Sequence, residues 1–175
     1  TMIELKKEGK VKYIGVCNFD VPLLKKCMEI EHVQSLQPPY SLLRRDIEKE
    51  ILPYCLQNEI GVVVYSPMQA GLLTGKFDIN NIGEDDWRRK NKYFQEPFLS
   101  KALAFVDKLK PIAEKSKKTV GNLAVAWVLM NKAVTSAIVG ARRSEQVMEN
   151  INADGYVLSE DEINEISKLL EEFEL

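Results

Sequence analysis

The fold is decided by one apolar run near the middle of the chain, Gly61-Val62-Val63-Val64-Tyr65-Ser66-Pro67. Its β-branched residues favour a strand, and the glycine before them and the proline after them mark its two ends. The run does not alternate between apolar and polar residues, which is typical of a parallel strand buried on both faces. We therefore predict a parallel sheet whose strands are joined by helices.

Strands and helices alternate on both sides of this run. Strands are predicted over residues 11–16, 32–37 and 136–139, and helices over 21–31, 45–58, 100–116, 119–131 and 144–153. Pro53 is expected to kink the helix over 45–58. A last helix begins after Ser159, with Glu162 three residues on as in a capping box. The first ten residues resemble the end of an amphipathic helix that stops at Gly9.

This order of elements predicts an α/β fold of the (β/α)8 TIM-barrel type. A complete barrel normally takes ~250 residues, so four strand–helix units and a C-terminal helix correspond to about its last half. We expect residues 1–175 to form a single domain, the C-terminal half of a barrel whose N-terminal half is absent from this chain. The alternative is a natural half-barrel whose exposed strand edges make it a homo-oligomer.

Composition and charge exclude several classes of protein. The chain has 24 Lys and Arg against 26 Asp and Glu, so no global field recruits nucleic acid or an anionic membrane. No apolar run approaches the ~20 residues of a membrane span. Three cysteines without metal-ligand spacing indicate neither a disulfide framework nor a zinc site, and they fit a reducing cytoplasm. The three carboxylates Glu84, Asp85 and Asp86 are interpreted as a solvated loop rather than a metal site.

Polar and aromatic side chains follow each predicted strand. Asn18 follows the first strand, Gln37 the second and Tyr65 the third, and Gly140 to Arg143 follow the fourth. In a βα barrel these positions share the rim that carries the chemistry. Two amide side chains on one rim could hold a carboxamide, and a tyrosine offers a flat face to a planar ring. Taken alone, each of these side chains would more often be structural, in a turn or in the core, but their joint position on one rim favours a ligand.

The segment from Gly140 to Asn150 has the features of an anion site. It joins a strand to a helix through small residues and the two arginines Arg142 and Arg143. The free N–H groups and partial positive charge of a helix N-terminus attract a phosphate, and guanidinium groups beside them add fixed charge. The alternative is that both arginines are ordinary solvated charges.

Five segments together resemble the aldo-keto reductases in order and approximate spacing. They are Gly9 to Phe19, Gln37 to Leu43, Tyr65 to Lys76, Asp86 to Arg89 and Ile138 to Asn150. The resemblance covers essentially the whole chain and corresponds to the C-terminal half of the family's barrel. It implies an NADP(H)-dependent oxidoreductase that reduces small-molecule aldehydes and ketones to alcohols.

The resemblance also implies a role for each matching residue. Asn18 and Gln37 would hold the nicotinamide carboxamide, and Tyr65 would stack on the nicotinamide ring. Ser66, Met68, Gly71, Lys76 and Arg88 would line the pyrophosphate path, with Arg88 reaching over from the long polar segment over residues 75–94. The remaining residues would contact the adenosine end: Arg142 and Gln146 at the 2'-phosphate, Glu149 and Asn150 at the adenine, and Gly140 and Ala141 in the turn between these groups.

The chain departs from the family pattern in two ways. Cys17 stands where the family often has serine. The family's catalytic tyrosine, lysine, aspartate and histidine all lie in the first half of the barrel, and the single histidine here, His32, lies at the wrong end of a strand for chemistry. We therefore expect no catalytic residue in this chain and an inactive fragment. The alternative function is an NADP(H)-binding sensing or interaction module with little or no turnover, like the channel-associated subunits that resemble this family.

Overall fold

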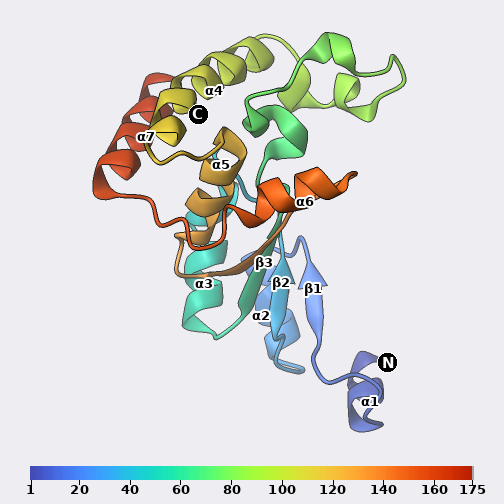
Figure 1. The fold of residues 1–175 in the computed structure, drawn as a ribbon. Coiled ribbons are helices and arrows are strands. Elements are labelled where there is room, and N and C mark those ends of the chain that lie inside the picture. The colour runs from blue at the N-terminus through green and yellow to red at the C-terminus, as the bar shows by residue number, and fades with distance from the viewer. Residues whose placement is uncertain (175) are drawn as a thin grey trace.

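A four-stranded parallel sheet forms the centre of the computed structural model, which describes residues 1–174 (Figure 1). The strands are β1 (Gly15–Cys17), β2 (Ser35–Gln37), β3 (Gly61–Tyr65) and β4 (Val134–Ile138). They lie side by side in the order in which they occur in the sequence, and every neighbouring pair is parallel. The parallel sheet predicted from the run at Gly61 is confirmed, and the carboxyl ends of the strands lie at one edge.

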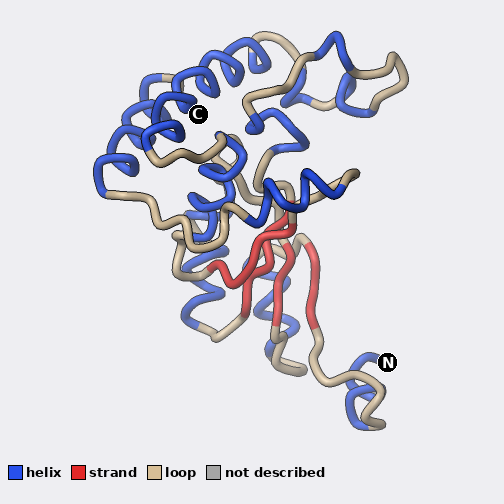
Figure 2. The backbone as a smooth tube through the Cα atoms, in the orientation of Figure 1, coloured by secondary structure: helices blue, strands red, loops and turns tan. Residues whose placement is uncertain are grey.

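The strands are connected and covered by helices (Figures 1 and 2). These are α1 (Met2–Lys7), α2 (Val21–Met28), α3 (Ile51–Gln57), α4 (Phe98–Lys115), α5 (Val120–Leu129), α6 (Ser144–Ile151) and α7 (Glu160–Glu172). In Figure 1, α4 and α7 lie against each other above the sheet, whereas α1 lies apart from the rest at the opposite end. The predicted capping box of the last helix is present, with Ser159 and Glu162 satisfying each other's backbone N–H groups.

Several predicted bounds differ from the structure: the strand expected over 32–37 is Ser35–Gln37, and the one expected over 136–139 is Val134–Ile138. Two further differences have a clear physical reason. The first strand begins at Gly15 rather than at residue 11. Its pairing with the segment that leads into β2 starts only at Ile14, whose carbonyl accepts from the Gln34 N–H and whose N–H donates to the Gln34 side chain. The helix expected over 45–58 is divided into a 3-10 turn, η1 (Asp46–Glu48), and α3. The predicted kink at Pro53 is wrong, since Pro53 lies in the first turn of α3, where its missing N–H would have had no helical partner.

The strands β3 and β4 pair with one irregularity. Val62 is opposite Val134, but the next residue, Val63, is opposite Ser136, so Thr135 is an extra residue in β4. At this irregularity the Thr135 hydroxyl takes the place of a backbone acceptor and accepts a hydrogen bond from the Val62 N–H at 3.2 Å. Beyond the bulge the pairing continues until Tyr65 lies opposite Ile138.

Two groups of buried side chains hold the chain together. One fills the space between α4, α5 and α7, with Phe105, Leu123 and Ile166 fully buried. The other packs α2, α3 and α5 on one face of the sheet, where Val62 and Val64 are fully buried. Val63 and Tyr65 on the opposite face are only half-buried, so burial on both faces is incomplete within the described chain. In residues 1–174 no helix is long and apolar enough to cross a membrane.

The long polar segment after Gly75 has a fixed shape without regular helices or strands. It is divided by three 3-10 turns, η3 (Ile79–Asn81), η4 (Trp87–Lys90) and η5 (Lys92–Phe94), which are capped by Asp78, Asp86 and Asn91 respectively. The guanidinium group of Arg89 donates to the backbone carbonyls of Ile79, Ile82 and Gly83. These contacts hold η3 and η4 together within the segment.

Candidate functional site

A groove of about 960 Å³ lies at the carboxyl ends of β3 and β4. Its walls are the turn that follows β3, the turn from β4 into α6, the N-terminus of α5 and one arginine of η4. It contains every residue predicted from the sequence to bind a cofactor except Asn18 and Gln37. The members of that predicted set in its walls are Tyr65, Ser66, Met68, Gly71, Lys76, Arg88, Gly140, Ala141, Arg142, Gln146, Glu149 and Asn150.

The turn after β3 is held in an uncommon backbone conformation. Ser66, Gln69, Ala70 and Gly71 all have positive φ, with Gly71 at 105°. This conformation is unfavourable for side chains other than glycine, so it persists only where the surroundings fix it. The buried Ser41 hydroxyl supplies one such contact, donating to the Gln69 side chain at 3.1 Å. The turn therefore presents a rigid backbone surface to the groove.

The turn after β4 leads into an open helix N-terminus. The residue before α6, Arg143, is extended, and no side chain caps the helix. Gln146 folds back so that its side-chain oxygen accepts from the Arg142 N–H at 2.7 Å, and the Asn150 amide donates to the Gly140 carbonyl at 3.3 Å. Among the ion pairs of residues 1–174, none involves Arg142 or Arg143. The end of the groove at α6 is thus positively charged and rich in donors.

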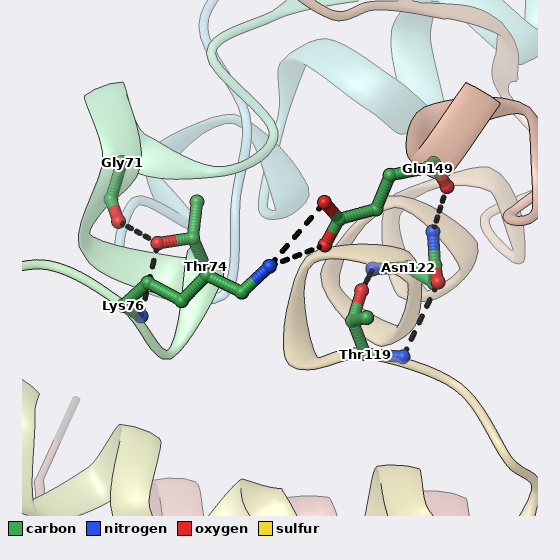
Figure 3. A network of polar contacts seen from close by, with 6 residues as sticks. All are labelled: Gly71, Thr74, Lys76, Thr119, Asn122 and Glu149. Atoms are coloured by element: carbon green, nitrogen blue, oxygen red, sulfur yellow. Dashed lines mark hydrogen bonds and ion pairs between the residues drawn. The ribbon is translucent and has the colours of Figure 1, made fainter. Parts of the chain in front are cut away.

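A network of polar contacts joins the two walls (Figure 3). The Lys76 ammonium lies 3.0 Å and 3.3 Å from the two carboxylate oxygens of Glu149, so an ion pair crosses from the turn after β3 to α6. The Glu149 carbonyl accepts from the Asn122 amide at 2.7 Å. Asn122 also forms a reciprocal capping box with Thr119 at the start of α5. The Asn122 bonds tie α6 to the start of α5, and the exposed Lys76–Glu149 pair adds a weaker link across the groove.

Arg88 reaches the groove from the long polar segment. Its guanidinium group donates to both carboxylate oxygens of Asp86, at 2.9 Å and 2.7 Å, and to the Ala70 carbonyl at 3.3 Å. Both side chains of the pair are less than one-fifth exposed. The hydrogen bonds from Arg88 lower the pKa of Asp86 to about 2 and raise the pKa of Arg88 above its ordinary value. The pair therefore stays ionised and braces the turn after β3, with part of the guanidinium group in the groove wall.

Asn18 and Gln37 lie outside the groove walls but are linked to them through Tyr65. The Tyr65 hydroxyl donates to the Asn18 side-chain oxygen at 3.1 Å. The Asn18 N–H donates to the Gln37 carbonyl at 3.2 Å, and the exposed Cys17 thiol lies 3.8 Å from the Gln37 side-chain oxygen. The structure therefore brings the ends of β1, β2 and β3 together on one edge of the sheet. Tyr65 lines the groove and also contacts Asn18, so it connects the groove with the other two strand ends.

Several residues of the walls were not predicted from the sequence. They include Ala70, Thr74, Thr119, Asn122 and Glu145. The capping box at Thr119 has Asn rather than Glu or Gln at its third position, so the usual signature does not single it out. His32, which is predicted to lie at the wrong end of a strand for chemistry, has its Nε2 atom 3.2 Å from the Asn58 carbonyl. Within residues 1–174 no group of His, Cys, Asp and Glu is arranged to hold a metal ion.

Comparison with known proteins identifies one family. The family model described as "Aldo/keto reductase family" matches residues 1–171. An NADH-specific methylglyoxal reductase of Escherichia coli strain K12 is 34% identical over 98% of this chain and 52% of its own length. The aldo-keto reductase YhdN of Bacillus subtilis strain 168 is 33% identical over 97% of the chain and 52% of its own length. The chain thus spans about half the length of these relatives.

Solved structures give the same result. The structure of the glycerol dehydrogenase AKR11B4 from Gluconobacter oxydans superimposes with a TM-score of 0.91. It is 34% identical, and the match covers 98% of this chain and 53% of that one. A thermostable aldo-keto reductase, Tm1743, is 26% identical with a TM-score of 0.71, over 96% of this chain and 52% of that one.

Proposed function

The chain belongs to the aldo/keto reductase family, and from that premise we propose that it is the C-terminal, cofactor-binding half of an NADP(H)-dependent reductase of small aldehydes and ketones. The groove at the ends of β3 and β4 carries this proposal. It joins a rigid backbone turn, an open helix N-terminus and two arginines outside any ion pair of residues 1–174, which suits a ligand with several phosphates.

The residues along the groove would meet the parts of a dinucleotide one after another, from the nicotinamide to the adenine. Tyr65, near Asn18 and Gln37, would bind the nicotinamide end, and the turn containing Ser66, Met68 and Gly71 would face the pyrophosphate. At the other end, Arg142 and Gln146 would meet the 2'-phosphate, with Glu149 and Asn150 beside the adenine. The bound nicotinamide supplies the hydride that reduces a carbonyl carbon. The side chains of this chain orient the ring and hold the phosphates.

The protonation of the carbonyl oxygen needs a general acid that we assign outside this chain. We propose that a tyrosine of an N-terminal half of the barrel takes this role, and that the chain alone is inactive. The free edges of β1 and β4 would pair with the strands of that half. The reading frame upstream of Thr1 tests this: four further strand–helix units support it, and a stop codon or unrelated sequence overturns it.

The cofactor assignment is tested by replacing Arg142. In Arg142→Ala, NADPH should bind about ten- to a hundredfold more weakly, because a charged hydrogen bond is lost, while NADH affinity should change little. Dissociation constants from the fluorescence of the reduced nicotinamide give both values. Lys132→Ala, an exposed cation outside the groove, is the matched control. Equal losses for NADPH and NADH would refute the assignment of Arg142 to the 2'-phosphate.

A second candidate is a nucleotide-sensing or interaction module. Its support is that the residues expected to hold the cofactor gather in one groove of this chain, whereas no catalytic residue is expected here. Measurable reduction of a simple aldehyde by the chain joined to its upstream half would exclude this function. Tight NADPH binding without turnover in that assembly would favour it.

A further inference from the structure

The positive end of the groove contains a carboxylate that has no role in the proposed function. Glu145 lies in the first turn of α6 and lines the groove beside Arg142, Arg143 and Gln146. The Ser144 hydroxyl donates to the Glu145 carboxylate at 3.1 Å, which holds this carboxylate close to the helix N-terminus. The anion site predicted from the two arginines therefore already has one negative charge of its own.

A carboxylate at the N-terminus of α6 competes with a phosphate for the same positive electrostatic potential. The partial positive charge of a helix N-terminus stabilises any anion in its first turn. Glu145 has no partner among the ion pairs of residues 1–174, so its charge is offset only by the helix end and by the neighbouring arginines. A phosphate that arrives at Arg142 meets this negative charge within the same turn.

A second group weakens the phosphate site in the same direction. The Gln146 side chain accepts from the Arg142 N–H at 2.7 Å, which occupies a backbone donor that a phosphate would otherwise use. The place that would receive a phosphate is therefore partly filled by groups of the chain itself.

We propose that Glu145 is a specificity-determining residue that offsets Arg142 and keeps the groove open to NADH as well as NADPH. The inference rests on the proposed function, because it assumes that the adenosine end of a dinucleotide lies at α6. NADPH carries a 2'-phosphate and NADH a free hydroxyl, so the charge of Glu145 acts against the first cofactor and hardly on the second. The family relative named as NADH-specific shows that this fold accommodates that cofactor.

The test measures dissociation constants for NADPH and NADH with Glu145→Gln, which removes the charge and keeps the shape. The preference for NADPH over NADH should rise about tenfold, because the removed charge repels the 2'-phosphate of NADPH and hardly acts on the hydroxyl of NADH. Gln146→Glu adds a charge one residue further on and should move the preference toward NADH by a similar factor. Glu160→Gln makes the same change in the first turn of α7, outside the groove, and should leave the preference unchanged.

The outcomes separate the two proposals. If both cofactors bind and Glu145→Gln leaves their ratio unchanged, the role of Glu145 is wrong and the proposed function stands. If the unchanged chain binds neither cofactor, the proposed function fails and this inference fails with it. A rise in the ratio in Glu145→Gln but not in Glu160→Gln supports the role of Glu145. An equal rise in both variants would overturn it, since the effect would then be one of net charge.

Discussion

The carboxylate of Glu162 makes the sharpest test of how the helices of this chain are held together. Glu162 is only 5% exposed, at the start of α7. It accepts hydrogen bonds from the Ser116 hydroxyl, the Tyr156 hydroxyl and the Ser159 N–H, each at 2.7 Å. Replacing it with alanine would leave three donors without their acceptor.

The cost of each substitution follows from these contacts. Glu162→Ala should lower the free energy of unfolding by about 3–5 kcal/mol, because hydrogen bonds to a charged group contribute ~1.5–3 kcal/mol each and do not add fully. Glu162→Gln should cost about 1–2 kcal/mol, since one amide oxygen can still accept from the Ser159 N–H while the two hydroxyls rotate to accept from the amide nitrogen.

The same contacts predict a dependence on pH. Burial alone would raise the pKa of Glu162, but the hydrogen bonds from Ser116, Ser159 and Tyr156 outweigh it and hold the pKa below the 4.5 of a free glutamate. The unfolded chain then binds the proton more readily than the folded chain. The stabilisation is complete above about pH 5.5 and is lost as the pH falls through 4.5 toward the folded pKa.

Urea unfolding followed by tryptophan fluorescence at several pH values measures both effects. The control is Glu165→Gln on the same helix. The side chains of its ion pair, Lys115 and Glu165, are 59% and 42% exposed, so the pair is expected to contribute less than ~1 kcal/mol to the free energy of unfolding. The acid limb of stability should be flatter in Glu162→Gln than in the unchanged chain. Equal free energies for the Glu162 and Glu165 variants, or an unchanged acid limb, would refute the reasoning.

Two further predictions concern the groove and the cysteines. Gly71→Ala should lower the free energy of unfolding in urea by about 1–3 kcal/mol, because φ at Gly71 is 105°. Crowding is not the cause, since no atom lies closer than 3.8 Å to the added carbon. The control Gly83→Ala should change the free energy by no more than ~0.5 kcal/mol. Equal effects at both glycines would contradict the strain argument. A thiol reagent such as DTNB should label the exposed Cys17 rapidly and Cys55 only on unfolding, because burial raises the pKa of Cys55 to about 11. Cys17→Ser should remove the fast phase, and a fast phase that persists would show that another thiol is accessible.

The sequence predicts the sheet and the edge that carries the groove because both depend on local pattern. A β-branched run such as Gly61 to Tyr65 indicates a strand wherever it occurs, and parallel strands place their ends at one edge. In the structure Tyr65, Gly140 and Arg142 line one groove. Their roles toward a cofactor stay predictions.

The features that the sequence does not predict depend on contacts between distant segments. The start of β1 is set by its exchange of hydrogen bonds with Gln34, not by the strand propensity of residues 11–14. The place of Asn122 in the groove wall depends on its bond to the Glu149 carbonyl, 27 residues further along the chain. The kink predicted at Pro53 is wrong because the effect of a proline depends on whether it lies in the interior of a helix or in the first turn.

The extra residue in β4 determines which way the arginine turn faces. Side chains alternate between the two sides of a strand, so one inserted residue reverses the direction of every side chain after it. With Thr135 in place, Tyr65 and Ile138 are paired at the edge and the chain from Gly140 onward enters the groove. Deleting Thr135 would restore a regular ladder and shift the exit of β4 by one position. A single residue that does not itself line the groove therefore sets the direction in which the turn with Arg142 leaves β4.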